Sequence, residues 1–320
     1  MTLFGIDSGG TTTRVVVRDD AGRPHVRTYP SLNPASVADP AANWDVALEA
    51  IAADGATLTG WIGSASATKE SLDAEAVHFR AAAERLGARG AAVVSNDMVP
   101  LLMGPPLDGV GTAVTVGTGT SFLARSHDGR IAAASGYEYL VSDEGGAFDI
   151  GLHGLRAAGR GYDGRGLETA LVGAAVELYG TDIPHLGQQL AGLARPKLEV
   201  SRFAPHVCAC ASAGDSAALA VVKRAVDAVV TGIAAVRWRV DATEDAILLA
   251  GGVIAGCDVI ASGICRELGE RWPSATVITA SDGAEAALTL AERSTSLALG
   301  DVARLAGGLP CRVVTFGDGG

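Results

Sequence analysis

The residues best suited to chemistry stand in a short loop near the start of the chain. Asp7 ends an apolar run, and the loop after it is rich in glycine and threonine. Glycines let the backbone come close to phosphate oxygens, and threonine hydroxyls add hydrogen-bond donors. Asp7 stands where a carboxylate can hold Mg²⁺ through water. An ordinary hairpin turn would have the same composition. The residues predicted to bind phosphate are Gly9, Gly10, Thr11, Thr12 and Thr13.

A second copy of this arrangement begins near Gly111. An apolar run again leads into a Gly/Thr loop, Gly117-Thr118-Gly119-Thr120. A β-rich run with an Asp-Gly turn then follows, which is a strong hairpin signal. Neither loop is a GxxxxGK[ST] phosphate loop, and Phe122 replaces the third glycine of a GxGxxG motif. The repeat favours phosphate binding over a plain turn. It predicts two domains of similar construction, each with one phosphate-binding loop.

Asp97 is a candidate general base, because it follows an expected strand at 90–95. Side chains at the carboxyl ends of strands in an open α/β sheet point toward the crevice where ligands bind. A carboxylate there can take the proton of a substrate hydroxyl as it attacks the γ-phosphorus of ATP. The alternative is a helix N-cap, which suits Asp97 and the following Pro100. The two interpretations are evenly supported, and both can hold.

Two further pairs of residues allow a functional and a structural interpretation. Asp143 and Glu144 adjoin an expected helix start, where acids usually stabilise the helix dipole. Carboxylates can also bind sugar hydroxyls through bidentate hydrogen bonds. Gly251 and Gly252 follow a buried strand at 246–250. They would let a base or ribose approach the backbone, or they would form a tight turn between strand and helix.

The elements that must position these residues alternate between strands and helices, which predicts an α/β architecture. Helical apolar spacing appears at 43–53 and 70–86, and the region 150–240 is rich in helix signals. Further helices are expected from 258 and from 282. The predicted division is an N-terminal domain at 1–107, a C-terminal domain at 108–293 and a tail at 294–320 that packs back on the N-terminal domain.

Composition and charge exclude several classes of protein. The chain has 320 residues, a net charge of −11 and no basic stripe, which argues against nucleic-acid binding. Neither a signal peptide nor an uninterrupted apolar stretch of membrane-spanning length is present. The five cysteines form no CxxC pair, and an odd number is a poor disulfide framework. A cytoplasmic protein with no membrane partner is therefore expected.

Taken in order, these segments resemble the BadF/BadG/BcrA/BcrD-type ATPases, and within them the N-acetylglucosamine and glucosamine kinases of the actin/hexokinase/heat-shock ATPase superfamily. The resemblance covers nearly the whole chain and rests on five motifs. These are Gly5-Ile6-Asp7-Ser8-Gly9-Gly10-Thr11-Thr12-Thr13, Ser95-Asn96-Asp97, Gly117-Thr118-Gly119-Thr120, Asp143-Glu144-Gly145-Gly146 and Leu249-Ala250-Gly251-Gly252-Val253. It implies two ribonuclease H-like (actin-like ATPase) domains with an ATP/sugar cleft between them.

The resemblance also implies an activity and a site. The expected reaction is transfer of phosphate from ATP, with Mg²⁺, to a hydroxyl of glucosamine or N-acetylglucosamine, at the 6-position. Asp97 matches the catalytic base, Asn33 a sugar-binding asparagine and Asp143 a sugar-binding acid. Gly251 and Gly252 belong to the motif that binds adenosine. The expected partner is a small sugar, and the expected assembly is a homodimer. Further residues expected at the sugar are Asn96, Ser121 and Glu144.

Three departures from the family's pattern concern the sugar pocket. Ser121 stands where such kinases often carry asparagine, and Gly136-Tyr137-Glu138 replaces a Gly-Trp-Gly segment. Phe148-Asp149 replaces an aromatic pair. The extra carboxylate of Asp149 would favour a cationic amine over an N-acetyl group. These changes leave ATP binding intact and put the identity of the sugar in question.

Other functions on the same fold are less consistent with the sequence. An ATPase that activates a 2-hydroxyacyl-CoA dehydratase needs cysteines beyond the second loop to hold an iron–sulfur cluster, and 120–207 contains none. A sugar sensor without catalysis would not need Asp97 beside both phosphate loops. A kinase for another sugar or a cyclitol is the remaining alternative.

Overall fold

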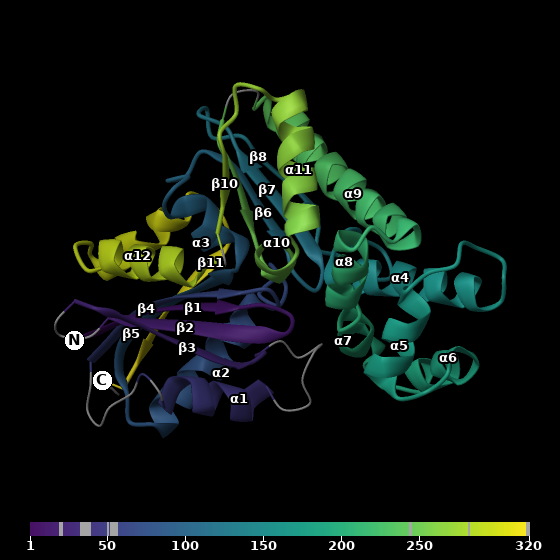
Figure 1. Ribbon diagram of the computed structural model, residues 1–320. Helices are drawn as coiled ribbons and strands as arrows, with labels where there is room; N and C mark the ends of the chain where they lie inside the picture. Colours follow the sequence, from purple (N-terminus) through teal and green to yellow (C-terminus); the bar gives the residue numbers. More distant parts are fainter. Residues whose placement is uncertain are drawn as a thin grey trace. The chain divides into compact units, whose positions relative to one another are not determined.

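The structure is a computed structural model and describes residues 1–18, 22–32, 40–49, 51, 57–242, 245–280 and 282–317. Its internal contacts divide the chain into two compact units (Figure 1). Unit 1 comprises Met1–Gly111 and Asp282–Gly320, and unit 2 comprises Thr112–Ser281. The domain boundary expected after 107 falls near the first division. Residues 282–293, expected in the second domain, lie in unit 1.

Unit 1 contains a six-stranded sheet in the order β11-β5-β4-β1-β2-β3. Strands β1, β4 and β5 are parallel, whereas β2, β3 and β11 each pair antiparallel with the strand beside them. The carboxyl ends of the three parallel strands therefore meet at one edge, which carries both Asp7 and the start of the segment after β5. The strands are β1 (Thr2–Ser8), β2 (Thr12–Arg18), β3 (Pro24–Pro30), β4 (Thr57–Ser64), β5 (Arg89–Asn96) and β11 (Cys311–Phe316).

Helices cover both faces of this sheet (Figure 1). Helices α1 (Pro40–Glu49) and α2 (Leu72–Arg85) share one core with the sheet. Helices α3 (Met98–Met103) and α12 (Ala284–Ser294), with the 3-10 helix η1 (Leu299–Ala306), share cores on the other face.

A single glycine explains why α12 belongs with unit 1. In β1, Phe4 and Ile6 are buried in the core shared with α1 and α2, and Gly5 lies between them. A Cβ atom on Gly5 would stand 2.2 Å from the carbonyl oxygen of Ala284 and 2.3 Å from the amide nitrogen of Leu288. Only glycine therefore lets the backbone of α12 lie directly against β1.

Unit 2 contains a five-stranded sheet in the order β10-β9-β6-β7-β8. Strand β9 pairs in parallel with both β6 and β10, and β7 pairs antiparallel with β8. The sequence of strand, Gly/Thr loop and strand in β6 and β7 repeats that of β1 and β2, as the internal repeat predicts. The strands are β6 (Gly111–Val116), β7 (Thr120–Arg125), β8 (Ile131–Ser135), β9 (Ile247–Ala250) and β10 (Val277–Thr279).

A large helical layer follows β8, as the helix signals at 150–240 predict. The long helix α9 packs on β7 and β8, and α4, α8 and α11 pack against α9. Within the described residues, no helix combines the length and the apolar character needed to cross a membrane. The helices are α4 (Ala147–Tyr162), α5 (Leu171–Tyr179), α6 (Ile183–Ala191), α7 (Pro196–Ser201), α8 (Ala204–Ser212), α9 (Ser216–Val240), α10 (Gly252–Gly256) and α11 (Asp258–Arg271).

One disulfide corrects the expectation drawn from the cysteine count. Cys208 in α8 is bonded to Cys257, the residue before α11, with a Cα–Cα distance of 5.9 Å. Both residues are buried in the core of unit 2. The pairing arises because α8 and α11 pack against each other and against α9, which the spacing of cysteines along the chain does not reveal.

Candidate active site

The loop between β1 and β2 is a tight turn held from both sides. The Gly9 amide donates to the carbonyl oxygen of Thr12 at 3.0 Å, and the Ser31 hydroxyl donates to the carbonyl oxygen of Gly9 at 2.7 Å. Thr13 is buried, with its hydroxyl 3.0 Å from that of Ser8. Thr12 is exposed. Among the residues predicted to bind phosphate, Thr13 therefore has its hydroxyl bonded inside the fold, and 10–12 form the accessible part of the loop.

Asp7 places a half-buried carboxylate at the end of β1. Its Oδ2 atom accepts a hydrogen bond of 2.8 Å from the amide of Gly283, just before α12. Burial raises the pKa of Asp7 to about 7, and the negative charges of Asp97 and Asp282 add to this effect. The Gly283 amide and Arg14 oppose it. Arg14 also pairs with Asp282 at 2.9 Å. Asp7 is thus a carboxylate among other acids, where a cation would relieve the repulsion.

Asp97 lies near Asp7 because β1, β4 and β5 run in parallel and in register. It follows β5 directly, and its side chain is buried. Burial raises the pKa of Asp97 to about 6, against the opposing effect of the backbone amides of Asp97 and Met98. The Asp97 side chain makes no N-cap hydrogen bond to α3. Instead, Oδ1 of Asn96 accepts a hydrogen bond from the Met98 amide at 3.1 Å.

Asp7 and Asp97, two neighbouring acids with raised pKa values, should destabilise the protein when no ligand is bound. Both folded-state pKa values exceed the ordinary value of 3.8, so the folded state binds more protons than the unfolded state between about pH 4 and 7. Stability is lost as the pH rises through that range. We expect Asp7→Asn and Asp97→Asn each to increase the free energy of unfolding by about 1–2 kcal/mol at pH 8 and by clearly less at pH 5.

Urea unfolding of the protein without nucleotide or metal, at both pH values, measures this effect. Glu70→Gln is the matched control, because Glu70 is exposed in the same unit and should give no pH-dependent difference. Equal changes at pH 5 and pH 8 in the Asp7 and Asp97 variants would contradict the prediction.

The second Gly/Thr loop, between β6 and β7, is hydrogen-bonded to the first residues of α4. The amides of Ala147 and Phe148 donate to the carbonyl oxygens of Gly117 and Thr118, at 2.8 and 3.1 Å. The Gly117 amide donates to the carbonyl oxygen of Gly119 at 2.9 Å. The conformation of the loop is therefore set by the beginning of the helix that follows the acidic motif.

Asp143 joins the acidic motif to this loop. Its Oδ1 atom accepts from the Thr120 amide at 3.1 Å, and its Oδ2 atom accepts from the Lys197 ammonium at 2.9 Å. Lys197 also pairs with Glu138 at 2.8 Å. A Cβ atom on Gly119 would stand only 2.3 Å from Oδ1 of Asp143. Gly119 is thus required by the buried carboxylate of Asp143, which has a protein partner on each oxygen.

The segment before α4 has an unusual backbone. Ser135, Glu138 and Asp143 have φ angles of 63°, 69° and 72°, and the glycines Gly136 and Gly145 also have positive φ. Left-handed conformations are costly for residues other than glycine, and they concentrate in binding and catalytic segments. The contacts of Asp143 with Thr120 and Lys197 help to hold this conformation, together with the hydrogen bond of 2.8 Å from the Tyr137 amide to the Ser142 hydroxyl.

The other residues expected at the sugar have different environments. Asn33 lies outside the described residues. Glu144 is exposed and Ser121 is half-buried on β7. Asp149 accepts a hydrogen bond from the Gly145 amide at 3.0 Å, and it also forms ion pairs in α4 and with α9. The structure therefore gives Asp149 protein partners, which weakens the expectation that it would select a cationic amine.

The two glycines after β9 differ in their surroundings. Gly251 has a φ of 108°, and a Cβ atom there would stand 2.6 Å from the carbonyl oxygen of Val116. Gly252 would meet nothing within 4 Å. Gly251 is thus required by the fold at the end of β6, whereas the space beside Gly252 is open.

Four residues around these sites were not predicted. Arg14, Asp282 and Gly283 surround Asp7, and Lys197 pairs with the acidic motif. The Asp-Gly pair at 282–283 was visible as a helix start, but its distance of 276 positions from Asp7 concealed the contact. Among the described residues, no group of three or more His, Cys, Asp or Glu side chains is arranged to hold a metal ion.

The arrangement of the strands in the two units identifies the fold. Two units, each with a sheet that begins with a hairpin and a Gly/Thr loop, form the actin-like ATPase fold of sugar kinases. The chain belongs to the BadF/BadG/BcrA/BcrD ATPase family, whose family model matches residues 4–291.

Solved structures share this fold. A candidate N-acetylglucosamine kinase of Chromobacterium violaceum superposes with a TM-score of 0.72 and 23% identity, over 91% of this chain and 98% of that one. A candidate N-acetylglucosamine kinase of Porphyromonas gingivalis gives 0.67 and 17%, over 92% and 100%. A ROK family glucokinase of Streptomyces griseus, in complex with glucose and AMPPNP, gives 0.60 and 18%, over 93% and 100%.

A curated relative matches over a shorter segment. The N-acetylmuramic acid/N-acetylglucosamine kinase of Clostridium acetobutylicum is 36% identical over 88 residues. The match covers 28% of this chain and 29% of that protein, less than a third of either length.

Proposed function

We propose that this protein is an ATP-dependent kinase that phosphorylates a hydroxyl group of an amino sugar. The observation that carries the proposal is the buried carboxylate of Asp97, placed beside Asp7 at the carboxyl edge of the parallel strands. The family and the fold supply the class, and the relatives named as N-acetylglucosamine kinases support the type of sugar.

Asp97 would act as the general base. Its carboxylate takes the proton of the sugar hydroxyl as the hydroxyl oxygen bonds to the γ-phosphorus, and the bond from that phosphorus to the bridging oxygen of ADP breaks. A pKa of about 6 suits this role, since the group is ionised at neutral pH yet remains basic enough to accept a proton. Asn96, which caps α3, leaves the Asp97 side chain without a capping function.

The two Gly/Thr loops would hold the phosphates of ATP. Residues 10–12 of the first loop and Thr118-Gly119 of the second would face the phosphates, and Gly251-Gly252 would lie against the adenosine. Gly117 and Thr120 would shape the second loop, because their amides and the Thr120 hydroxyl already have protein partners. Neutralisation of charge on the phosphates of ATP is the chemistry that Mg²⁺ would supply when bound with the nucleotide. Asp7 fits as the protein partner of Mg²⁺ through water, because a cation would offset both the loss of hydration and the repulsion from Asp97 and Asp282 that raise the Asp7 pKa.

We place N-acetylglucosamine ahead of glucosamine as the substrate, with transfer to the 6-hydroxyl. Asp143 is paired with Lys197, and Asp149 is paired with His153 and Arg224. An uncompensated carboxylate that would attract an ammonium group is therefore lacking at these two positions. The candidates for sugar contacts remain Asn33, Asn96, Ser121 and Glu144. The homodimer and the cytoplasmic location also remain predictions.

An ADP-release assay over a panel of sugars tests this function. The panel contains N-acetylglucosamine, glucosamine, N-acetylmuramic acid, glucose and a cyclitol, each with Mg²⁺ and ATP. We expect N-acetylglucosamine to give the highest kcat/KM, about tenfold or more above glucosamine, and ³¹P–¹H correlation of the product to place the phosphate on the 6-oxygen. Failure to turn over any member would contradict kinase activity on sugars of this kind. A preference for glucosamine would contradict only the argument that Asp143 and Asp149, being paired already, do not attract an ammonium group.

A further inference from the structure

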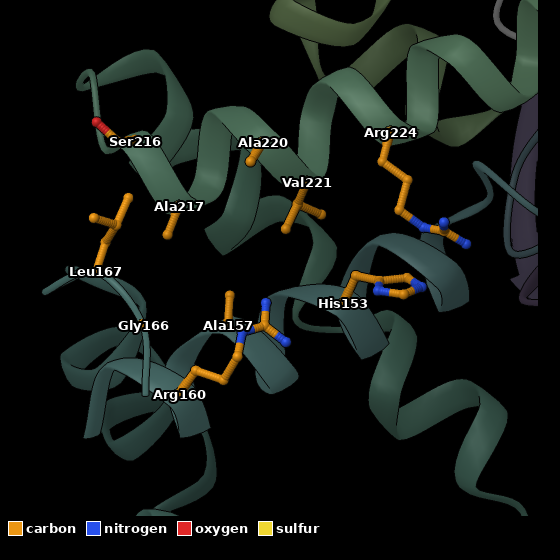
Figure 2. Close-up of a pocket in the computed structure, with 10 residues that line it drawn as sticks. All are labelled: His153, Ala157, Arg160, Gly166, Leu167, Ser216, Ala217, Ala220, Val221 and Arg224. Carbon is orange, nitrogen blue, oxygen red and sulfur yellow. The ribbon is translucent and has the colours of Figure 1, made fainter. Parts of the chain in front are cut away.

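An open pocket lies within unit 2, between α4 and α9 (Figure 2). Its volume is about 320 Å³, at the lower end of the range for small-molecule sites. The helical positions recur every three or four residues on each side, so one face of α4 is opposed to one face of α9. The residues that line it are His153, Ala157, Arg160, Gly166, Leu167, Ser216, Ala217, Ala220, Val221 and Arg224.

Cationic groups enter this pocket from both helices. Figure 2 shows His153 and Arg160 on one helix, and Arg224 extending toward His153 from the facing helix. In the described part of the chain, the guanidinium of Arg160 makes no hydrogen bond or ion pair, and Arg224 has only a contact of 3.5 Å with Asp149. Positive charge gathered in this way is notable on a chain of net charge −11.

The carboxylate of Asp149 faces this positive charge. Asp149 lies 3.3 Å from Nε2 of His153. Burial lowers the pKa of His153, whereas the negative charge of Asp149 raises it. The positive charges of Arg224, Arg156 and Arg160 lower this pKa further. The guanidinium groups of Arg160 and Arg224 outnumber this carboxylate, so the pocket has an excess of positive charge and suits an anionic group.

Apart from Ser216, the rest of the lining is apolar, and most of it is small. Ala157 on α4 and Ala217, Ala220 and Val221 on α9 leave the space open, and Leu167 lies at one end. A ligand suited to this pocket has an anionic group for the cations and a compact body that packs on these side chains.

We propose that this pocket binds a small phosphate monoester, with its phosphate between Arg160, Arg224 and His153 and its body over the alanines. Arginine suits phosphate because its planar guanidinium donates two parallel hydrogen bonds. The bound phosphate would compete with Asp149 for Arg224 and His153. Since Asp149 also accepts from the Gly145 amide, the ligand would lie next to the acidic motif that holds the second phosphate loop.

The proposal is tested by phosphate binding with a probe inside the pocket. The imidazole resonances of His153 are followed by NMR during titration with inorganic phosphate and with glycerol 3-phosphate, and affinities are measured by calorimetry. The test variant is Arg160→Gln/Arg224→Gln. The matched control is Arg165→Gln/Arg266→Gln, which removes the same charge from two exposed arginines of unit 2 outside the pocket.

We expect the His153 pKa to rise when either ligand binds to the wild-type protein or the control, and the ester to bind more tightly than inorganic phosphate. The test variant should bind at least about tenfold more weakly, as loss of charged hydrogen bonds implies. Unchanged His153 resonances in the wild-type protein would overturn the proposal, even if calorimetry detected phosphate at the nucleotide loops. Equal binding by the test and control variants would overturn it as well. Arg160→Gln alone repeats the comparison if the double variant does not fold.

Discussion

Asp97→Asn should lower the kcat of sugar phosphorylation by about 10²–10⁴-fold, the range expected when a general base is removed. Asparagine keeps the shape and the hydrogen-bonding oxygen of the side chain but cannot take a proton from the sugar hydroxyl. ATP affinity should change little, because the two Gly/Thr loops are untouched. Steady-state kinetics with the best sugar of the panel and calorimetry with ATP measure the two effects separately.

The control for this prediction is Asp108→Asn, an exposed carboxylate of unit 1 that pairs with Arg293. It should retain kcat within about twofold, since surface substitutions have small effects. The Asp97 variant should also be more stable than the wild-type protein at pH 8, so loss of activity cannot be attributed to unfolding. Retention of more than about a tenth of kcat would show that another group takes the proton.

Gly119→Ala should damage both stability and catalysis. The new Cβ atom would stand 2.3–2.4 Å from the carboxylate of Asp143, which is itself held by Thr120 and Lys197. Relief of this overlap requires the loop or the carboxylate to move. We expect a loss of about 1–3 kcal/mol in the free energy of unfolding, as for other overpacked sites. We also expect a fall of about 10²-fold in kcat/KM, because a shift of about 1 Å in a positioning loop has effects of this size.

Gly117→Ala provides the matched control in the same loop. A Cβ atom on Gly117 would meet only Thr115 Cγ2, at 4.0 Å, so stability should be nearly unchanged. Thermal or urea unfolding of the two variants makes the comparison. The double variant Gly119→Ala/Asp143→Gly should recover part of the lost stability, since the clash is removed and glycine suits the positive φ of Asp143. Equal destabilisation by the two alanine substitutions would contradict a role for the Asp143 carboxylate.

Local patterns were enough to predict much of this protein. The two strand–loop–strand segments could be predicted from the sequence, because a hairpin depends on residues close together in the chain. The placement of Asp7 and Asp97 at the ends of strands was likewise visible, and the order of the five motifs identified the family. The helix-rich region before 240 followed from apolar spacing.

Contacts between segments far apart in the chain could not be predicted from such local patterns. The approach of α12 to β1 depends on the absence of a side chain at Gly5, and it brings Gly283 and Asp282 to Asp7. The burial that raises the pKa values of Asp7 and Asp97 exists only once the parallel strands are assembled. The bonds of Asp143 to Thr120 and Lys197 span 23 and 54 positions.

The sequence alone therefore predicts the motifs, their order and the chemistry that each can perform, since these depend on residue type and short spacing. The fold determines that Asp7 and Asp97 lie together at the carboxyl ends of the parallel strands. Because of the fold, the carboxylate of Asp143 is already paired with Lys197, and Cys208 is bonded to Cys257. It also determines that arginines of α4 and α9 face one pocket. The physical reason is that charge, burial and packing act through space, between residues whose distance along the chain says nothing of their distance in the molecule.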